Sequence, residues 1–363
     1  MKIEKGKISN LQLTILFAAL ILASDPALAN AGAPAKNNGW LAFLVAIVMG
    51  SIIIYIFTSL SQKFPGKNLV QINSMIYGRY LGSFISICYL WYFCHLASNN
   101  IWYNSAIYVN TILKDTPEAV IYISFILITA YALRKGLEVI TRSVVFLFLL
   151  IVVIIIISEF LLLKEMKIKY LLPIMDIPMR DFLVSTFSIT TLNFGESIVF
   201  LMIMGRVTNV KILKKSVFMG LIIGSGLLLL ISLTTTMVLG PVESIAFIPS
   251  FHMYRLINVG DIFTRMEALL LGMLQAMAFI RISLFLYGAV MVGAQLFNMR
   301  SYLPLVLPVA IIAGNIAYLQ RGVELRLDYG VNTLPYYSLP YELIIPLLSL
   351  ILASVKEKRY PKE

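Results

Sequence analysis

The stretch Thr191-Leu-Asn-Phe-Gly-Glu-Ser197 lies in the middle of an apolar run that is long enough to cross a membrane. Within it, the carboxylate of Glu196 costs about 2.5–3.5 kcal/mol at membrane depth, so it is rarely present without a role. Gly195, with Asn193 before it and Ser197 after it, marks a place where a spanning helix is expected to open its backbone. Phe194 lies within the same break. An interrupted helix with one acid is a common way to build a substrate or ion site at the membrane midplane. The alternative is a purely structural carboxylate in an interhelical hydrogen bond.

The composition of the chain is that of a polytopic membrane protein in a lipid bilayer. Of its 363 residues, 60% are apolar and 13% are charged, with a mean hydropathy of +0.88, whereas soluble domains contain about 25% charged residues. The net charge of +11 does not indicate nucleic acid as a partner, because the basic residues lie between apolar runs. Cys88 and Cys94 fall in one predicted helix, which excludes a disulfide framework or a cysteine metal cluster. The sequence contains no catalytic motif and no metal-ligand spacing, so we predict neither an enzyme nor a cofactor.

The N-terminus has features of a signal peptide but is predicted to remain as the first membrane span. Lys2, Lys5 and Lys7 precede an apolar run, and Ala27-Leu-Ala29 has the small residues of a cleavage site. However, Asp25-Pro26 interrupts the run and many further apolar segments follow, so a retained span is favoured.

Hydropathy predicts ten membrane segments in an all-α protein, since each span needs about 20 residues. All ten belong to one domain, because no loop between them is long enough for a soluble domain. The segments are Leu11–Ala33, Gly39–Leu60, Leu81–Val109, Pro117–Leu133, Val144–Leu163, Phe182–Met204, Val217–Leu239, Ile262–Phe297, Leu303–Leu319 and Leu339–Val355.

The first and sixth segments differ from the rest because both are interrupted. The first is strongly apolar only over Leu11–Ala23, about 20 Å of helix, which is shorter than the ~30 Å hydrocarbon core. It must therefore continue past Ser24-Asp25-Pro26, where Pro26 removes a backbone donor and bends the chain. The sixth segment is interrupted around Asn193–Glu196.

The two interruptions also suggest an internal repeat. An offset of 171 residues, which separates Asp25 from Glu196, aligns the second segment with the seventh and the third roughly with the eighth. Two five-helix halves follow, about residues 8–165 and 180–356, and the odd number of spans in each gives them opposite orientations. Inverted repeats with interrupted first helices are typical of the LeuT-type transporter fold. The sequence similarity between the halves is weak, so this 5+5 repeat is a geometric prediction.

Loop charges predict that both termini are cytoplasmic. The loops on the side of the termini carry 18 Lys and Arg residues, and those on the other side carry 10. Because cytoplasmic loops of membrane proteins are enriched in Lys and Arg, the first side is assigned to the cytoplasm. The Lys164–Lys169 cluster argues weakly for the opposite orientation without reversing the sum.

Arg281 is a basic residue predicted to lie deep inside the eighth segment. Snorkelling to the membrane surface is hard from that depth, so a partner is expected. In one interpretation, Arg281 pairs with Glu196 and holds the helices in register. In the other, Arg281 contacts the carboxylate of a ligand. The sequence leaves both open.

Further candidate residues lie at the two breaks and on the third segment. Backbone donors at half-helix N-termini can hold a carboxylate, while free carbonyls and Glu196 can hold an ammonium group or a cation. Asp25 is either a second partner for a cation or a cap of the half-helix that begins at Pro26. His95 and Asn99 share a helix face at i,i+4. We predict Asn99 as a ligand contact and His95 as a hydrogen-bonding packing residue.

Seven short stretches are distinctive in their order and spacing: Lys7-Ile8-Ser9-x-x-Gln12, Phe64-Pro-Gly-Lys-Asn-Leu69, Tyr80-Leu-Gly82, Thr116-Pro117, Ala130-Tyr-Ala-Leu-Arg-Lys-Gly-Leu-Glu-Val-Ile-Thr-Arg142, Leu171-Leu-Pro-Ile174 and Phe194-Gly-Glu196. Together they resemble the spore germination permease family, the B subunits of bacterial spore germinant receptors. This family belongs to the amino acid–polyamine–organocation transporter superfamily. The resemblance covers nearly the whole chain, and its most specific parts are the Tyr131–Arg142 stretch and Phe194-Gly-Glu196.

The resemblance implies a protein of the inner membrane of a dormant spore. It further implies recognition of a small germinant, often an amino acid, in company with an A subunit and a lipoprotein C subunit. A freestanding amino acid/cation symporter of the same superfamily is the alternative function. The family often has glycine at the first-helix break where this chain has Ser24-Asp25-Pro26, so its ligand can differ from a plain small amino acid.

Overall fold

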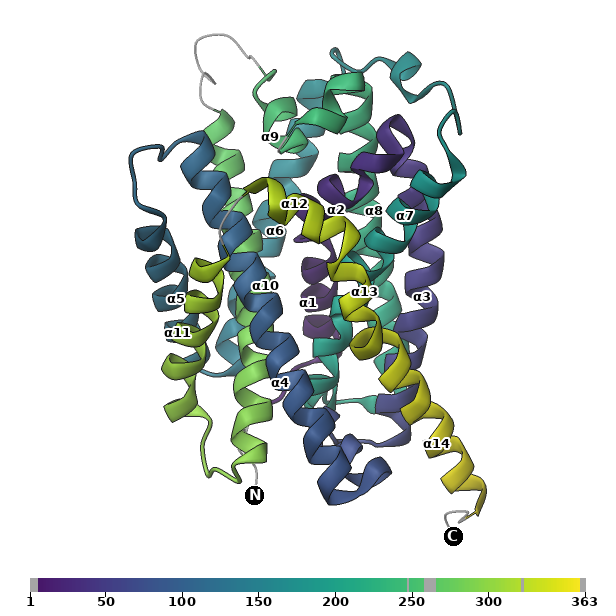
Figure 1. Ribbon diagram of the computed structural model, residues 1–363, viewed down its shortest axis with the longest axis vertical. Helices are drawn as coiled ribbons and strands as arrows, with labels where there is room; N and C mark the ends of the chain where they lie inside the picture. Colours follow the sequence, from purple (N-terminus) through teal and green to yellow (C-terminus); the bar gives the residue numbers. More distant parts are fainter. Residues whose placement is uncertain (1–5, 247, 258–265, 321–322, 360–363) are drawn as a thin grey trace.

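The computed structural model describes residues 6–246, 248–257, 266–320 and 323–359, which form a nearly all-helical bundle (Figure 1). Both ends of the chain lie at the same end of this bundle, and α9 and α12 lie toward the other end. The α-helices are α1 (Asn10–Leu22), α2 (Asp25–Gly32), α3 (Gly39–Lys63), α4 (Leu69–Thr111), α5 (Glu118–Arg134), α6 (Leu137–Leu162), α7 (Met179–Ile189), α8 (Leu213–Leu239), α9 (Pro249–Tyr254), α10 (Met266–Leu296), α11 (Leu303–Leu319), α12 (Val323–Asn332), α13 (Leu334–Leu339) and α14 (Ile345–Arg359). Short 3₁₀ turns are η1 (Ala33–Asn38), η2 (Ile168–Leu171), η4 (Gly195–Met202), η5 (Met204–Arg206), η6 (Val210–Ile212) and η7 (Gly240–Ile245), and π-helical turns are η3 (Thr190–Phe194) and η9 (Pro340–Ile344).

Helix α1 begins at a capping box and runs through the interior of the bundle. The Ser9 hydroxyl accepts from the Gln12 N–H at 3.1 Å, and the Gln12 side chain accepts from the Ser9 N–H at 2.8 Å. These two bonds satisfy donors that the start of a helix leaves free. Most of α1 is buried, and Gly220 and Gly224 of α8 lie directly against its backbone. Two small residues at a spacing of four let two membrane helices approach closely.

Six stretches of helix are long and apolar enough to span a membrane, among the residues that the structure describes. They lie within Ala33–Lys63, Leu69–Thr111, Leu137–Leu162, Val210–Ser244, Leu269–Leu296 and Leu334–Val355, and α1 and α11 are shorter apolar helices. Each predicted segment falls largely on helical chain, although residues 262–265 of the eighth lie outside the described residues. The all-helical membrane fold is therefore confirmed, while the total of ten crossings stays a prediction.

Two segments differ from their predicted form. The third was expected to begin at Leu81, but α4 begins at Leu69 and contains a non-helical residue at Gly78, where φ is +80°. A positive φ of this kind suits glycine, which has no Cβ to clash, so a short helix precedes the span. The tenth was expected to be one helix, Leu339–Val355, but it is divided into α13, η9 and α14. Its interruption was not predicted.

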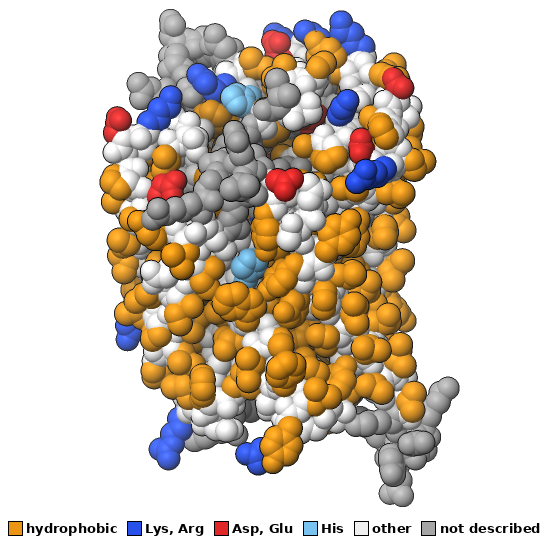
Figure 2. All heavy atoms as spheres, viewed as in Figure 1, with side chains coloured by type: hydrophobic (Ala, Val, Ile, Leu, Met, Phe, Trp, Pro, Cys, Tyr) orange, Lys and Arg blue, Asp and Glu red, His pale blue; other side chains and the backbone are white. Residues whose placement is uncertain are grey.

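The distribution of apolar and charged side chains on the surface matches that expected for a protein in a bilayer. Figure 2 shows a broad band of apolar side chains around the middle of the molecule, with charged side chains gathered mainly toward its two ends. Such a band matches the hydrocarbon core, in which exposed charges are costly. On the face seen there, Asp and Glu side chains occur only toward the end that lies opposite the chain termini. Lys and Arg side chains occur toward both ends.

Candidate functional site

The first break lies where the sequence predicted it, at Ser24-Asp25. Helix α1 ends at Leu22 and α2 begins at Asp25, so Ala23 and Ser24 form the turn between them. The Ser24 hydroxyl donates to the carbonyl of Ile21 at 2.5 Å and accepts from the Asn193 side-chain N–H at 2.6 Å. A side-chain hydrogen bond therefore joins the first interrupted segment directly to the sixth.

The sixth segment changes its winding instead of unwinding. Helix α7 passes into the π turn η3 and then into the 3₁₀ turn η4, with the junction at Gly195. The N–H of Gly195 donates to the carbonyls of Thr190 and Thr191. The expectation of an opened backbone with a free amide is therefore wrong at Gly195, because a wider turn followed by a tighter one keeps this donor paired.

Phe194 is a packing residue in this conformation. Its side chain is fully buried, and its ring stacks on that of Phe43 with 5.9 Å between centroids. It also fills the space beside Gly50 of α3, where an added Cβ would overlap the ring. Contact of Phe194 with a ligand stays a prediction, and it would require this packing to change.

Arg281 and Glu196 form a buried ion pair that connects α10 with the sixth segment. The Arg281 side chain is 4% and the Glu196 side chain 5% exposed, and Nη2 of Arg281 donates to Oε2 of Glu196. The guanidinium also donates through Nε to Oδ1 of Asn100 at 3.0 Å and through Nη2 to the carbonyl of Leu192 at 3.4 Å. Arg281 and Glu196 are thus paired, and contact of Arg281 with a ligand carboxylate stays a prediction. Within the described residues, its Nη1 atom has no hydrogen-bond partner.

The third segment approaches this pair through Asn100, the neighbour of the predicted Asn99. Asn100 accepts the hydrogen bond from the Arg281 guanidinium, and the role of Asn99 as a ligand contact stays a prediction. His95 lies at a buried position, 3.4 Å from the hydroxyl of Tyr329 and edge-on to the ring of Tyr337. These contacts agree with the hydrogen-bonding packing role predicted for His95.

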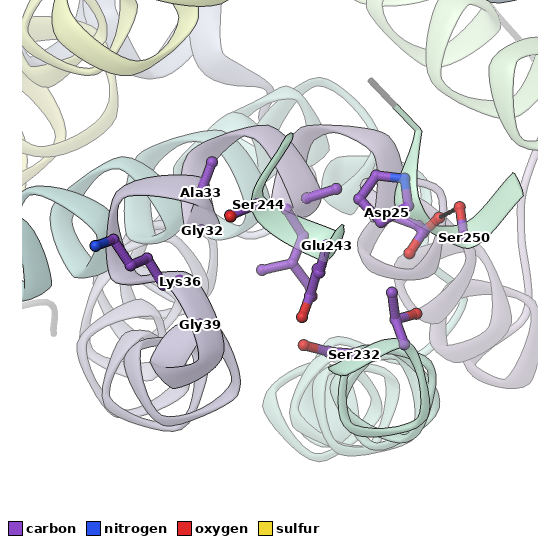
Figure 3. A pocket seen from close by; sticks show the side chains of 13 residues that line it. Asp25, Gly32, Ala33, Lys36, Gly39, Ser232, Glu243, Ser244 and Ser250 are labelled. Carbon is purple, nitrogen blue, oxygen red and sulfur yellow. Dashed lines mark hydrogen bonds between the residues drawn. The ribbon is translucent and has the colours of Figure 1, made fainter. Parts of the chain in front are cut away.

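Asp25 is bonded to α9, which lies toward the end of the bundle opposite the termini (Figure 1). Its carboxylate accepts a hydrogen bond from the Ser250 hydroxyl of α9 at 3.0 Å, and the side chain is 5% exposed. Asp25 and Ser250 line a cavity with Glu243 of η7 and Ser232 of α8, and Figure 3 shows the Asp25–Ser250 bond at one side of it. The loop helix α9 therefore lies directly over the first break. The side chain of Pro26 lies outside the described residues.

Glu342 is the main residue of this region that the sequence analysis missed. It lies in η9, is 1% exposed, and accepts a hydrogen bond from the Tyr92 hydroxyl at 2.5 Å. An available signal was the sequence Leu334-Pro-Tyr-Tyr-Ser-Leu-Pro-Tyr-Glu342, in which two prolines and an acid enter an apolar run. That combination meets the same criteria that singled out Asp25-Pro26. The partners Asn100 and Ser250 carried no comparable signal.

The two interrupted segments meet at the Ser24–Asn193 hydrogen bond, and the sixth also carries the buried Arg281–Glu196 pair. An apolar helical bundle arranged in this way has the LeuT-type transporter fold. The structure resembles that of Mhp1, a nucleobase-cation-symport-1 family transporter in a closed conformation with bromovinylhydantoin bound, with a TM-score of 0.73 at 12% identity over 94% of this chain and 77% of the other. It also resembles MhsT in complex with L-phenylalanine, with a TM-score of 0.63 at 14% identity over 97% and 89% of the two chains. At these identities the likeness shows the fold alone.

The sequence itself specifies the family. The spore germination protein model matches residues 7–321, so the chain belongs to the spore germination protein family. It is 26% identical to spore germination protein KB of Bacillus subtilis (strain 168) over 99% of this chain and 98% of that protein. It is 24% identical to spore germination protein B2 of the same organism over 62% and 59% of the two chains. A multi-pass membrane protein of permease type is thereby established.

Proposed function

We propose that the chain is the germinant-recognition subunit of a spore germinant receptor, which binds a small germinant such as an amino acid at its interrupted helices. The observation that carries the proposal is the buried Arg281–Glu196 pair at the sixth-segment break, whose guanidinium retains a free N–H group at Nη1. Buried donors and acceptors are nearly always satisfied. A free one at a helix break is therefore a suitable contact for a ligand carboxylate.

A second free polar atom supports the same site. Oδ1 of Asn193 has no hydrogen-bond partner in the described part of the chain, while its amide nitrogen donates to Ser24. In transporters of this fold, the interrupted first and sixth segments move relative to the rest of the bundle. Here the Ser24–Asn193 hydrogen bond joins these two segments, and the unpaired Oδ1 of Asn193 lies beside it. A ligand that bonds both Asn193 and Arg281 would change the balance between closed and open arrangements. Such a change is what an A subunit and a lipoprotein C subunit would sense in the inner membrane of the spore.

The test of this proposal is the substitution Glu196→Gln. We expect the protein to accumulate, because the Arg281 guanidinium keeps its hydrogen bonds to Asn100 and the Leu192 carbonyl and has the Glu342 carboxyl nearby. The germinant concentration for half-maximal spore germination should rise about tenfold or more, which corresponds to the loss of one hydrogen bond to a charged group. Glu159→Gln is the matched control, because Glu159 is also a buried acid but bonds Thr234 away from the break. Germination of Glu196→Gln spores at wild-type germinant concentrations, with normal protein level, would make Glu196 purely structural.

A freestanding amino acid/cation symporter is the second candidate, and the fold favours it specifically. One structural relative is a Na⁺-coupled sialic acid symporter, with a TM-score of 0.64 at 10% identity over 97% of this chain and 90% of the other. Vesicles that contain the purified protein separate the two functions. Accumulation of labelled amino acid against its gradient would favour the symporter, whereas binding without accumulation would favour the receptor subunit.

The orientation of the chain gives a further prediction. Both termini should be cytoplasmic, because the terminal side of the sequence carries the larger number of Lys and Arg residues. Tags at either end of the chain should therefore be protected from a protease or a membrane-impermeant label in intact cells and accessible after permeabilisation. An accessible tag in intact cells would overturn the orientation or the even number of crossings.

A further inference from the structure

Glu342 brings a second acid to the Arg281–Glu196 pair. It lies in the π turn η9, between α13 and α14, at a point where Pro340 begins the turn. Its side chain is almost completely buried inside a predicted span. An acid at this depth is costly, and such residues usually mark a functional site.

Only one oxygen of the Glu342 carboxylate has a partner. The Tyr92 hydroxyl of α4 donates to Oε1 at 2.5 Å, whereas Oε2 accepts no hydrogen bond from any described residue. The same carboxylate lies against Gly195, where an added Cβ would overlap it. The unused oxygen thus belongs to a side chain that packs directly on the turn of the sixth segment, next to Glu196.

A second carboxylate, that of Glu342, lies near the ion pair of Arg281 and Glu196. Arg281 forms its ion pair with Glu196, and Glu342 interacts electrostatically with both of them. No ion pair of Glu342 itself is found in the described chain. An ionised Glu342 would give this cluster of three side chains one excess negative charge, and a buried acid in such a place is neutralised either by a proton or by a cation. The site therefore has the capacity for one additional positive charge.

We propose that Glu342 accepts the positively charged group of the ligand, and that the ligand carries a net positive charge, as basic amino acids and amines do. The proposal rests on the function proposed above and defines the ligand class of the same site. A ligand with one net positive charge offsets an ionised Glu342, whereas a neutral zwitterion leaves an ionised Glu342 without a counter-charge.

The cavity at the first break has more acidic than basic residues in its lining. Asp25 and Glu243 are acidic and Lys36 is basic, and Figure 3 shows all three around it. A cleft lined by acids within low-dielectric walls raises the local concentration of cations. The cavity lies at the first break, so a cationic compound would be concentrated where the interrupted segments begin.

Matched pairs of compounds test the charge of the ligand. L-arginine and L-citrulline differ in a guanidinium group against a neutral urea group, and L-lysine and L-norleucine differ in a side-chain ammonium group. Their affinities for the purified full-length protein are measured by ligand-dependent thermal stabilisation. We expect the wild-type protein to bind the cationic member of at least one pair about tenfold or more tightly, and Glu342→Gln to lose that preference. Glu159→Gln should keep it.

Equal affinity for both members of each pair in the wild-type protein would overturn the inference, and so would an unchanged preference in Glu342→Gln. If Glu342→Gln does not fold, the wild-type comparison still decides the charge of the ligand. A different result would contradict the proposed germinant-recognition function. In that case Glu196→Gln spores germinate normally, whatever the charge preference of the purified protein.

Discussion

Replacement of Arg281 with alanine is expected to lower the amount of protein in the membrane severely. The substitution leaves Glu196 buried with no cation beside it, and it also removes the donor to Asn100. Breaking one side of a buried ion pair typically costs about 3–5 kcal/mol, a large part of the stability of most proteins. Quantitative immunoblots of spore membranes would measure the loss.

The double substitution Arg281→Ala with Glu196→Ala is the control for this mechanism. Apolar replacement of a complete buried pair is often tolerated, so much of the lost protein should return. If the protein level returns but the germinant response does not, the pair both stabilises the folded protein and takes part in ligand binding. The opposite outcome is a normal amount of Arg281→Ala protein with a germinant response shifted to higher concentration. That result would mean that Arg281 serves the ligand more than the fold.

The contact between α1 and α8 predicts the second large effect. An added Cβ at Gly224 would lie 2.6 Å from the carbonyl oxygen of Ala18, and at Gly220 it would lie 2.5 Å from that of Thr14. Both neighbours are backbone atoms that cannot move without shifting the helix. The double substitution Gly220→Ala with Gly224→Ala should therefore destabilise the protein, with about 1–3 kcal/mol expected for each overpacked position.

Gly226→Ala is the matched control on the same helix, because a Cβ there meets nothing within 4 Å. Alanine has a higher helix propensity than glycine by about 1 kcal/mol, so this control should be neutral or slightly stabilising. The apparent unfolding temperature in detergent measures both variants. Similar values for the double variant and Gly226→Ala would mean that α1 and α8 separate easily, which contradicts the close packing of these helices.

Much of the fold followed from the sequence because the bilayer restricts what a chain can do. In hydrocarbon every backbone group must be bonded within the protein, so long apolar runs have to be helices. The first break was predictable at Ser24-Asp25-Pro26 because the apolar run before it is too short to cross. The position of the sixth break was predictable from Glu196. Its geometry was not, since the choice between an unwound gap and a π turn depends on how neighbouring helices pack.

The site was predicted only in part, and the misses have a common cause. A soluble helix shows its buried face by its apolar stripe, but lipid is as apolar as the protein interior, so membrane helices lack that signal. Asn99 and Asn100 point about 100° apart on a helix of 3.6 residues per turn, and the sequence of α4 did not indicate which of them faces Arg281. The structure shows that Asn100 does.

The sequence by itself determined the membrane-spanning helical class, the family, and the places where Asp25, Glu196 and Arg281 had to find partners, because charges in an apolar run cannot be left unpaired. Only the tertiary structure decided which partners those are. It joined Asn193 to Ser24, Asp25 to Ser250, and Glu342 to the turn at Gly195. A charged residue within an apolar run is recognisable from the sequence, because burying it is costly. Which groups offset that cost depends on how helices that are distant in the sequence pack together.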